Sequence, residues 1–181
     1  MKKLSVLKLS IFSLLLTALI PVVTMAQDDD KSKLINDANK ARDEFMKTDS
    51  LMKHLFDNSV GYVIFPNVGK GAIGVGGAAG NGILFEQGNA VGKAKMKQVT
   101  VGFQFGGQAY REVIFFENQA ALDQFKEGHF ELSAQASAVA ATKGASADVK
   151  YRNGIMIFTQ EKAGVMYEAS IGGQKFKFTP Y

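Results

Sequence analysis

The stretch that decides the fold runs from Gly61 to Glu86 and reads GYVIFPNVGKGAIGVGGAAGNGILFE. Valine, isoleucine, phenylalanine and tyrosine alternate here with glycine, and the hydrophobic period falls towards two residues, as is typical of β-strands. Glycines without side chains permit tight turns, bulges and close strand approach in a strongly curved sheet. After Asn58 we therefore expect a strongly twisted, glycine-rich antiparallel sheet or partial barrel.

The same alternation predicts further strands downstream. In Lys175–Phe178 the lysines face one side and the phenylalanines the other, which indicates a half-buried antiparallel strand. Residues 160–164 and 172–173 separate such runs and predict hairpin turns. The alanines and serines of 132–144 suit a helix or a strand equally, so that segment stays open. In all, strands are expected near 61–65, 72–78, 82–86, 94–105, 110–117, 154–159, 165–170 and 174–178.

Helices are expected before and within this β region. Residues 32–47 carry apolar side chains at steps of four, three and four, which predicts an amphipathic helix that packs on its own domain, a lipid-lying helix being the alternative. Residues 48–50 are N-cap types, and the apolar pattern restarts at Leu51, so a second short helix should follow. A third helix should begin after Asn118 and end near Gly128. The fold class is therefore α+β, with N-terminal amphipathic helices packed on the sheet.

The first 26 residues have the order of a signal peptide. Two lysines, an apolar stretch shorter than a membrane span and Thr24-Met25-Ala26 come in turn, and three aspartates follow. Cleavage after Ala26 is expected, with an uncleaved anchor as the alternative. The chain then divides into a signal peptide (1–26), an N-terminal helical segment (27–57) and a glycine-rich β domain (58–181) that forms one domain with the helices. We expect an exported protein, periplasmic or secreted, with peripheral membrane association.

Charge and cysteine content exclude several classes of function. The formal net charge is +4, but three of the lysines lie in the expected signal peptide, so the remaining chain is nearly neutral. An overall basic field for nucleic acid is therefore absent, and we expect no nucleic-acid partner. The chain has no cysteine, so disulfides, thiolate chemistry and lipidation at a cysteine are excluded.

Enzyme signatures are missing. The sequence contains no G-x-S-x-G elbow, no H-E-x-x-H motif and no P-loop. Its two histidines, His54 and His129, are far apart; His129 and Glu131 could share a metal ion in principle, but an ordinary surface pair is favoured. The glycine run 74–82 resembles a dinucleotide fingerprint only weakly, because strand-type residues and no helix follow it. We expect no enzyme activity, no cofactor and no metal.

Lysines at alternate positions are the strongest candidate site. Lys93, Lys95 and Lys97 share one face if they lie on a strand, while Ala94 and Met96 turn inward. Near an anionic lipid surface each such cation contributes about 1 kcal/mol. Solvated lysines that protect a sheet edge are the alternative. The candidate lipid-binding residues are Lys70, Lys93, Lys95, Lys97, Lys175 and Lys177.

Three segments resemble the SYLF lipid-binding family. Residues 61–82 are similar to the family's strand ending in Ile-Phe-Pro, which a lysine and spaced glycines follow; here that lysine is Lys70. Residues 102–125 resemble its Gly-x-Gln-x-Gly-x-Gln strand, apolar strand and short helix, and residues 162–173 its closing hairpin. The family often has Trp-Ser-x-Pro where this sequence has residues 86–90 without tryptophan. Eukaryotic members are associated with phosphoinositides and actin. Because an exported chain would meet neither of these, the resemblance implies only generic lipid binding.

Two functions follow as hypotheses. The first is an exported, non-enzymatic module that binds anionic phospholipid at a membrane surface through the lysines. The second is a structural or protein-interaction component of the cell envelope, which pairs its β edges with itself or with another envelope protein. A hydrolase with an unfamiliar site is disfavoured, because no acid, base or metal cluster is evident.

Overall fold

The computed structural model describes residues 20–73, 75–101, 108–128, 130–132, 137–162, 168–170 and 172–181. The chain divides into two compact units, Met1–Lys33 and Leu34–Tyr181. Of the first unit, residues 20–33 are described, and they form the beginning of helix α2, Ile20–Thr48. Among the described helices, none is both long enough and apolar enough to cross a bilayer. The rest of the description concerns the second unit.

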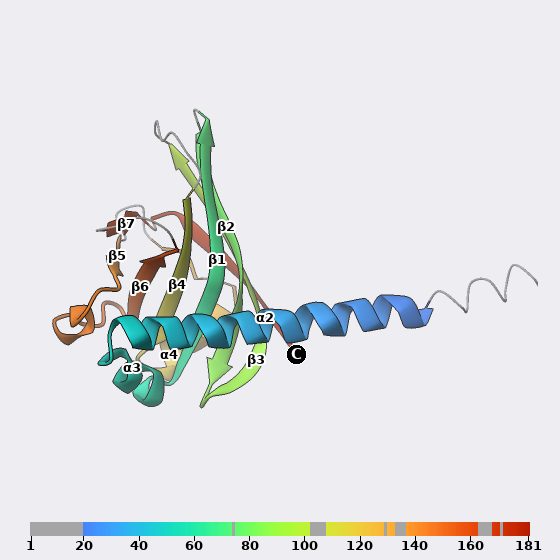
Figure 1. Ribbon diagram of the computed structural model, residues 1–181, viewed down its shortest axis with the longest axis horizontal. Helices are drawn as coiled ribbons and strands as arrows, with labels where there is room; N and C mark the ends of the chain where they lie inside the picture. The colour runs from blue at the N-terminus through green and yellow to red at the C-terminus, as the bar shows by residue number, and fades with distance from the viewer. Residues whose placement is uncertain are drawn as a thin grey trace, which may run out of the picture. The chain divides into compact units, whose positions relative to one another are not determined.

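An eight-stranded sheet forms the centre of this unit (Figure 1). Its order is β7-β5-β6-β4-β1-β2-β3-β8, and since β7 and β8 stand at its two ends, the sheet is open. All pairs are antiparallel except β5 with β6, which are parallel. The expectation of a purely antiparallel sheet was wrong there. The long connection 141–154 between these two strands, unlike a tight hairpin, allows them to run in the same direction. The strands are β1 Gly61–Ile73, β2 Val75–Glu86, β3 Asn89–Val101, β4 Gln108–Phe116, β5 Ser137–Ala140, β6 Ile155–Glu161, β7 Glu168–Ser170 and β8 Gln174–Pro180.

Two long strands, β1 and β2, replace the three short ones expected over residues 61–86. The strand expected to end at Phe65 continues through a register shift. The pairing of β1 with both neighbouring strands shifts around Pro66, which has no N–H to donate. Gly82 shows why glycine is needed opposite this bulge. A Cβ atom at Gly82 would lie 2.6 Å from the carbonyl oxygen of Ile64 and 2.7 Å from the Phe65 ring. Glycine therefore lets β1 and β2 approach closely, and the glycine run continues as strand.

Helix ends follow the sequence in part. Asn118 caps α4, Gln119–Lys126, by accepting a hydrogen bond from the Ala121 N–H at 3.0 Å, and Gly128 has φ +74°, both as expected. The helix expected over 32–47 ends at Thr48 but starts earlier, at Ile20 within the described residues. Helix α3, Met52–Asn58, has Leu51 as its N-cap without a side-chain hydrogen bond. The N-cap therefore lies one residue after the expected positions 48–50, although the Asp49 carboxylate accepts a hydrogen bond from the Leu51 N–H at 3.0 Å.

The segment left open at 132–144 contains a strand in its described part. Residues 137–140 form β5, Gly144 has φ +76°, and a short 3-10 helix, Ala145–Ala147, follows. The turn expected at 172–173 is present, whereas Gln160 and Glu161 still belong to β6. The remaining expectations at 102–105, 133–136 and 163–167 lie outside the described residues.

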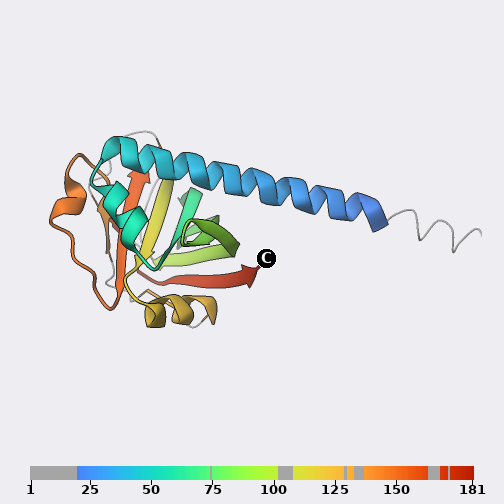
Figure 2. The same ribbon diagram turned by 90° about the horizontal axis from the view of Figure 1, so that it is seen from below.

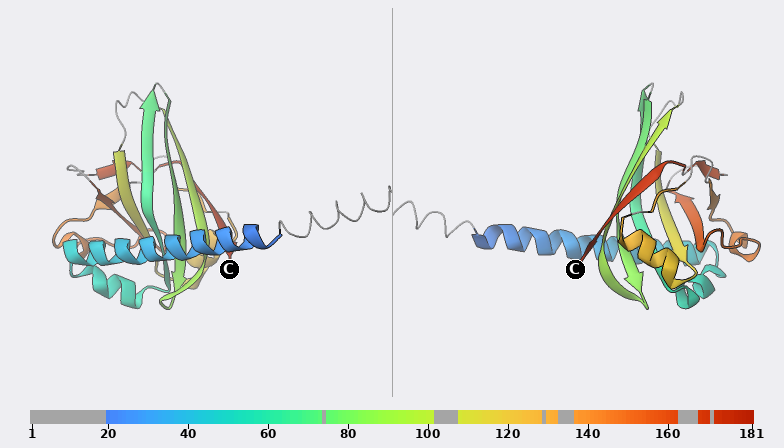
Figure 3. Two further views of the ribbon diagram at one scale, coloured as in Figure 1. Left: turned by 45° about the vertical axis from the view of Figure 1, so that its right-hand side comes forward. Right: turned by 180° about the vertical axis from the view of Figure 1, so that it is seen from behind.

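One face of the sheet, here called the inner face, packs against α4. Figure 2 shows α4 and the 34–48 part of α2 on opposite sides of the sheet, and Figure 3 shows β8 crossing on the side of α4. Aromatic rings dominate this inner core: Phe176 lies 5.8 Å from Phe65 and 5.5 Å from Phe125 between ring centroids. Since Phe65 is on β1 and Phe176 on the edge strand β8, the sheet curls towards this face. The inner core comprises Val63, Phe65, Val68, Ala78, Leu84, Ala94, Met96, Tyr110, Ile114, Phe116, Ala121, Leu122, Phe125, Leu132, Ala138, Ile157 and Phe176.

The opposite, outer face is covered in part by α2 and α3. Ala38, Ala41 and Phe45 of α2 are buried at steps of three and four residues, as in the predicted stripe, and Met52 and Phe56 of α3 join them. Their partners are side chains of β1, β2, β4 and β6, together with one residue after β5. They are Tyr62, Ile64, Ile83, Phe85, Val113, Phe115, Ala141, Met156 and Phe158.

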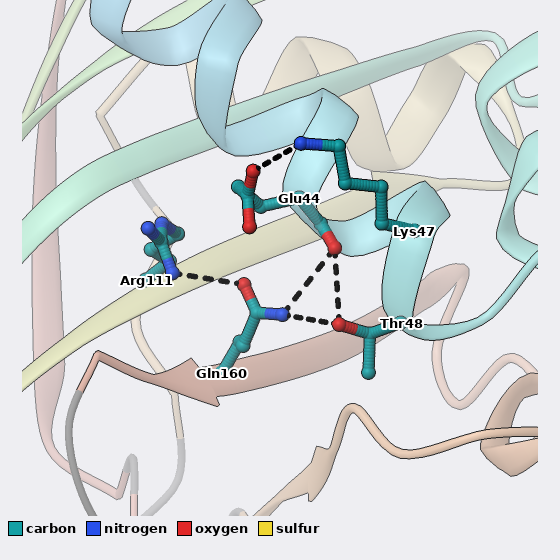
Figure 4. A network of polar contacts seen from close by, with 5 residues as sticks. All are labelled: Glu44, Lys47, Thr48, Arg111 and Gln160. Atoms are coloured by element: carbon teal, nitrogen blue, oxygen red, sulfur yellow. Dashed lines mark hydrogen bonds and ion pairs between the residues drawn. The ribbon is translucent and has the colours of Figure 1, made fainter.

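Polar contacts fasten the end of α2 to the sheet (Figure 4). The Gln160 amide nitrogen on β6 donates to the Thr48 hydroxyl at 2.6 Å and to the Glu44 carbonyl at 3.3 Å. The amide oxygen of Gln160 accepts from Arg111 Nη1 on β4 at 3.1 Å. One side chain therefore joins the last turn of α2 to two strands.

Candidate functional site

The candidate site is the outer face of β3 and β8. Ala94 and Met96 of β3 and Phe176 of β8 are buried in the inner core, so the residues between them face the other way. Lys95, Lys97, Lys175 and Lys177 are exposed, and Lys93 is half-buried. The inward and outward assignment made from alternation is therefore confirmed.

Strand register brings these lysines together. In the antiparallel pair of β3 with β8, Lys95 is directly opposite Lys177, and Lys97 is directly opposite Lys175. Directly opposite residues have Cβ atoms about 4.5–5.5 Å apart, and like charges at this spacing destabilise a sheet. We call Lys93, Lys95, Lys97, Lys175 and Lys177 the lysine face. Two facing like-charged pairs favour an anion as the group that would bind there.

Acidic neighbours neutralise little of this charge. Glu131 Oε2 lies 3.4 Å from Lys175 Nζ, and both side chains are exposed, so this pair is weak. Within the part of the chain that the structure describes, no ion pair engages Lys95, Lys97 or Lys177. Lys93 is opposite Thr179 on β8 and Ile83 on β2. The lysine face is thus a local positive patch.

Lys70 is placed apart from the lysine face. Its backbone pairs with Ala78 of β2 and Gln108 of β4, so β2 separates its strand from β3. Its side chain lies outside what is described. The structure therefore does not join Lys70 to the other five candidates, and its suggested role stays a prediction.

Val99 is a feature of this face that the sequence analysis missed. It follows Lys97 by two residues on β3, and 71% of the residue's surface is exposed. The alternation that places Lys95 and Lys97 outward also places Val99 there, so the pattern could have revealed it. An apolar group thus stands at the end of the lysine row.

A buried polar cluster supports β8 from the inner side. Glu112 of β4 and Gln174 of β8 are both fully buried, and Gln174 Nε2 donates to Glu112 Oε2 at 3.0 Å. In the sheet order β1, β2 and β3 lie between β4 and β8. The bond therefore crosses the concave inner face of the curled sheet and joins two strands that are not neighbours. Burial raises the pKa of Glu112 to about 7, although the bond from Gln174 opposes the shift. Periodicity alone did not reveal this cluster, because its members are far apart in the sequence.

Metal-binding groups are not assembled in the described residues, where no three histidine or acidic side chains lie close enough to share an ion. His54 is exposed, and its Nδ1 lies 2.9 Å from Asn58 Nδ2 on the next turn of α3. His129 lies outside the described residues.

Comparison with known proteins identifies the family. Residues 97–179 match the Ysc84 family, described as "Las17-binding protein actin regulator". The matched segment begins at Lys97 and includes β8 as far as Thr179. The chain carries a SYLF (Ysc84) domain. This SYLF domain contains three of the five lysines of the lysine face, and Lys93 and Lys95 lie just before the matched segment.

A curated relative extends the match. The chain is 30% identical over 127 residues to beta cell expansion factor A of Aeromonas veronii, which covers 68% of this chain and 48% of the relative. The chain therefore spans about half the length of that relative. The two proteins share the SYLF family.

Proposed function

We propose that this SYLF protein is a non-enzymatic module that binds anionic phospholipid through its lysine face. The observation that carries the proposal is the register of β3 with β8, which sets Lys95 against Lys177 and Lys97 against Lys175. Phosphate groups placed between facing ammonium groups relieve the repulsion that the bare sheet carries. The exposed Val99 at the end of the row provides an apolar contact with the membrane interface. SYLF-family membership supports lipid binding as a class of function.

The proposal includes export. The order of basic, apolar and small residues before Gln27 supports a cleaved signal peptide. Helix α2 continues past position 26, so cleavage would shorten this helix without removing it. Export would be supported if the protein recovered outside the cytoplasm had the intact mass of a chain that begins at Gln27. An unprocessed chain in the cytoplasmic fraction would contradict it.

Vesicle flotation tests the lipid-binding proposal. We expect the protein to float with phosphatidylglycerol-containing vesicles and not with pure phosphatidylcholine vesicles, and we expect added salt to weaken binding because it screens exposed charges. The double variant Lys95→Glu with Lys177→Glu should lose binding at least tenfold, since it reverses the charge of one facing pair.

A matched control separates the lysine face from net charge. Lys143 and Lys150 are exposed and lie outside β3 and β8, so Lys143→Glu with Lys150→Glu changes the net charge equally. This control should bind like the wild type. Equal loss in both double variants would show that net charge and not the lysine face determines binding, and full binding by Lys95→Glu with Lys177→Glu would refute the proposal.

An envelope-interaction role is the second candidate, and the edge position of β8 favours it. Apart from an isolated bridge between Glu131 and Lys175, β8 pairs only with β3 among the described strands. Such an edge can add a strand from a partner. Light scattering without lipid distinguishes the two roles, because edge pairing with a second copy predicts a mass that rises with protein concentration.

A further inference from the structure

The inner face of the sheet holds β8 in two different ways along its length. From Phe176 onward the contact is apolar, because this side chain belongs to the inner core. At the start of the strand the contact is polar, since Gln174 donates to Glu112 of β4 at 3.0 Å. Gln98 of β3, directly opposite Gln174, donates to the Gly172 carbonyl at 3.0 Å. The start of β8 therefore depends on buried polar side chains, and of these Glu112 can ionise.

Glu112 and Gln174 each retain one buried oxygen without a donor. Among the described residues nothing donates to Glu112 Oε1 or to Gln174 Oε1, and both atoms are closed to solvent. Buried polar atoms nearly always have a partner. A carboxylate offers acceptors alone, whereas a neutral carboxyl group carries an O–H donor and is complementary to an amide, which has both a donor and an acceptor. A proton on Glu112 therefore supplies the donor that this pair lacks.

The strands beside Glu112 bring no positive charge to it. Its cross-strand neighbours are Phe65 on β1 and Thr159 on β6, and both side chains are uncharged. The titratable groups that β4 and β6 bring to the same face are Tyr110 and Glu161, which lie opposite each other. Burial raises the pKa of Glu112, and a charge on Glu112 helps to raise the pKa of Tyr110. This part of the inner face thus favours the uncharged form of Glu112.

Charges on the other neighbouring elements are engaged elsewhere. No described cation forms an ion pair with Glu112. Lys126 of α4 pairs with Glu86 at 2.6 Å, and Asp123 of α4 is exposed. The lysine face is on the outer side of the sheet, and the Lys70 side chain lies outside what is described. An ionised Glu112 would therefore be a buried charge without a partner, which is strongly unfavourable.

The start of β8 is the part that can move to hydrate such a charge. The strand of Glu112 is central, between β1 and β6, whereas β8 is at the edge of the sheet. On the outer face Lys175 is opposite Lys97, and like charges at this spacing oppose the pairing of the two strands. We propose that Glu112 is a pH-sensitive switch: with its proton it binds Gln174 and keeps the Lys97–Lys175 pair assembled, and once the proton has passed to solvent it releases the start of β8.

The switch has a consequence for anion binding that rests on the proposed function. Release of the start of β8 separates Lys175 from Lys97, so an anion that binds between them should bind more weakly as the pH rises through 7. Linkage is reciprocal, so an anion that binds the assembled pair alone should make Glu112 take up a proton.

Amide hydrogen exchange without lipid tests the switch. The reporters are the Gly173 N–H, which donates to the Leu132 carbonyl at 3.0 Å, and the Leu132 N–H, which donates to the Gln174 carbonyl at 3.1 Å. The pKa of Glu112 is about 7 in the assembled form against an ordinary value of 4.5, so the protection factors of both reporters should fall about tenfold between pH 6 and pH 8. Low urea should barely change them, because a local opening exposes little surface.

Glu112→Gln is the decisive variant, because glutamine keeps a neutral group in place and cannot ionise. Its two reporters should have the same protection at pH 6 and pH 8. Glu131→Gln is the matched control: it removes an exposed acid beside Lys175 and next to the Leu132 reporter, and it should keep the tenfold fall. Carbon-13 NMR of the wild-type Glu112 carboxyl group, which needs no variant, should show a titration near pH 7.

Three results would overturn the switch. They are wild-type protection that is equal at pH 6 and pH 8, an equal fall in Glu112→Gln, and a Glu112 carboxyl group that is already charged at pH 6. Reporter exchange that depends on urea as strongly as the exchange of the buried Ile114 amide would also overturn it, since the whole domain and not the start of β8 would then be opening.

Flotation with phosphatidylglycerol-containing vesicles at pH 6 and pH 8 tests the control of anion binding. The wild type should bind several-fold more weakly at pH 8, and Glu112→Gln should bind equally at both pH values. Equal wild-type binding at both pH values would refute this control. Absence of flotation at either pH would refute the proposed function instead, and hydrogen exchange would still decide whether Glu112 releases β8.

Discussion

At the scale of single residues, Glu112 is the most unusual side chain. It is fully buried on the inner face of β4, one carboxylate oxygen accepts from Gln174, and the other oxygen has no partner among the described residues. Burial raises its pKa from 4.5 to about 7, so the folded protein holds this proton more tightly than the unfolded chain does. The contribution of Glu112 to stability is therefore fully present below about pH 4.5 and is lost as the pH rises through 7.

Glu112→Gln should remove this pH dependence. For the wild type we expect Glu112 to lower the free energy of unfolding by about 3 kcal/mol between pH 4.5 and pH 7.5, at 1.36 kcal/mol per pKa unit. The glutamine variant should be more stable than the wild type at pH 8 and should lose that advantage near pH 5, as measured by urea unfolding. Glu117→Gln, which removes an exposed acid just after the same strand, is the control. Identical pH profiles of Glu112→Gln and wild type would contradict the assignment.

Asp49 shows the opposite behaviour in a different pH range. Burial alone would raise its pKa, but hydrogen bonds from Ser146, Leu51 and Gly144 lower it below the ordinary value of 3.8. The Ser146 N–H and hydroxyl lie 2.8 and 2.7 Å from Asp49 Oδ2. The stability that Asp49 contributes is lost only as the pH falls below about 4, so it does not overlap with the Glu112 range.

At the scale of elements, the packing of α2 on the sheet depends on its apolar stripe and on one glutamine. Gln160 joins Thr48 and the Glu44 carbonyl to Arg111 of β4 (Figure 4). Gln160→Ala leaves these partly buried groups without their partner, so we expect a loss of about 1–3 kcal/mol in the free energy of unfolding. Hydrogen exchange should also become faster in the last turn of α2.

Lys47→Ala provides the comparison for that element. Lys47 pairs with Glu44 at 2.7 Å on the exposed side of the same turn, and such pairs add little to stability. We expect no measurable change in unfolding or in exchange. A similar effect of both variants would show that the network of Gln160 does not fasten the helix.

The sequence predicted the faces of the elements better than their ends. The alternation of Lys95 and Lys97 with buried Ala94 and Met96 was sufficient to assign both sides of β3, because only one face of that strand reaches the core. The end of β1 was predicted wrongly at Phe65, since proline usually ends a strand and here the chain forms a bulge at Pro66. The bond between Gln174 and Glu112 could not be predicted at all, because the two residues are 62 positions apart in the sequence and only the fold brings them together.

At the scale of the whole domain, one sheet carries two cores. Phe115 and Phe116 are neighbours on β4 and both are fully buried, yet Phe115 belongs to the outer core and Phe116 to the inner core. Because both cores contain buried residues of β1, β2, β4 and β6, we expect them to unfold together. Phe115→Ala and Phe116→Ala should each lower the free energy of unfolding by about 3–5 kcal/mol. In each variant, far-ultraviolet circular dichroism and tyrosine fluorescence should report the same single urea transition, shifted to lower urea concentration. Two separate transitions in either variant would show that the cores are independent.

The position of β8 in the chain has a consequence for biosynthesis. Half of each facing lysine pair, and the glutamine that binds Glu112, lie in Gln174–Pro180, after every other strand in sequence order. A nascent chain that has not yet released this segment from the ribosome has neither the facing pairs nor the bond across the curl. Any product of premature termination before Gln174 has the same defect. If the lysine face binds anions as proposed, chains that stop before Gln174 should be retained less strongly than full-length chains on a cation-exchange column, because they lack the facing lysine pairs.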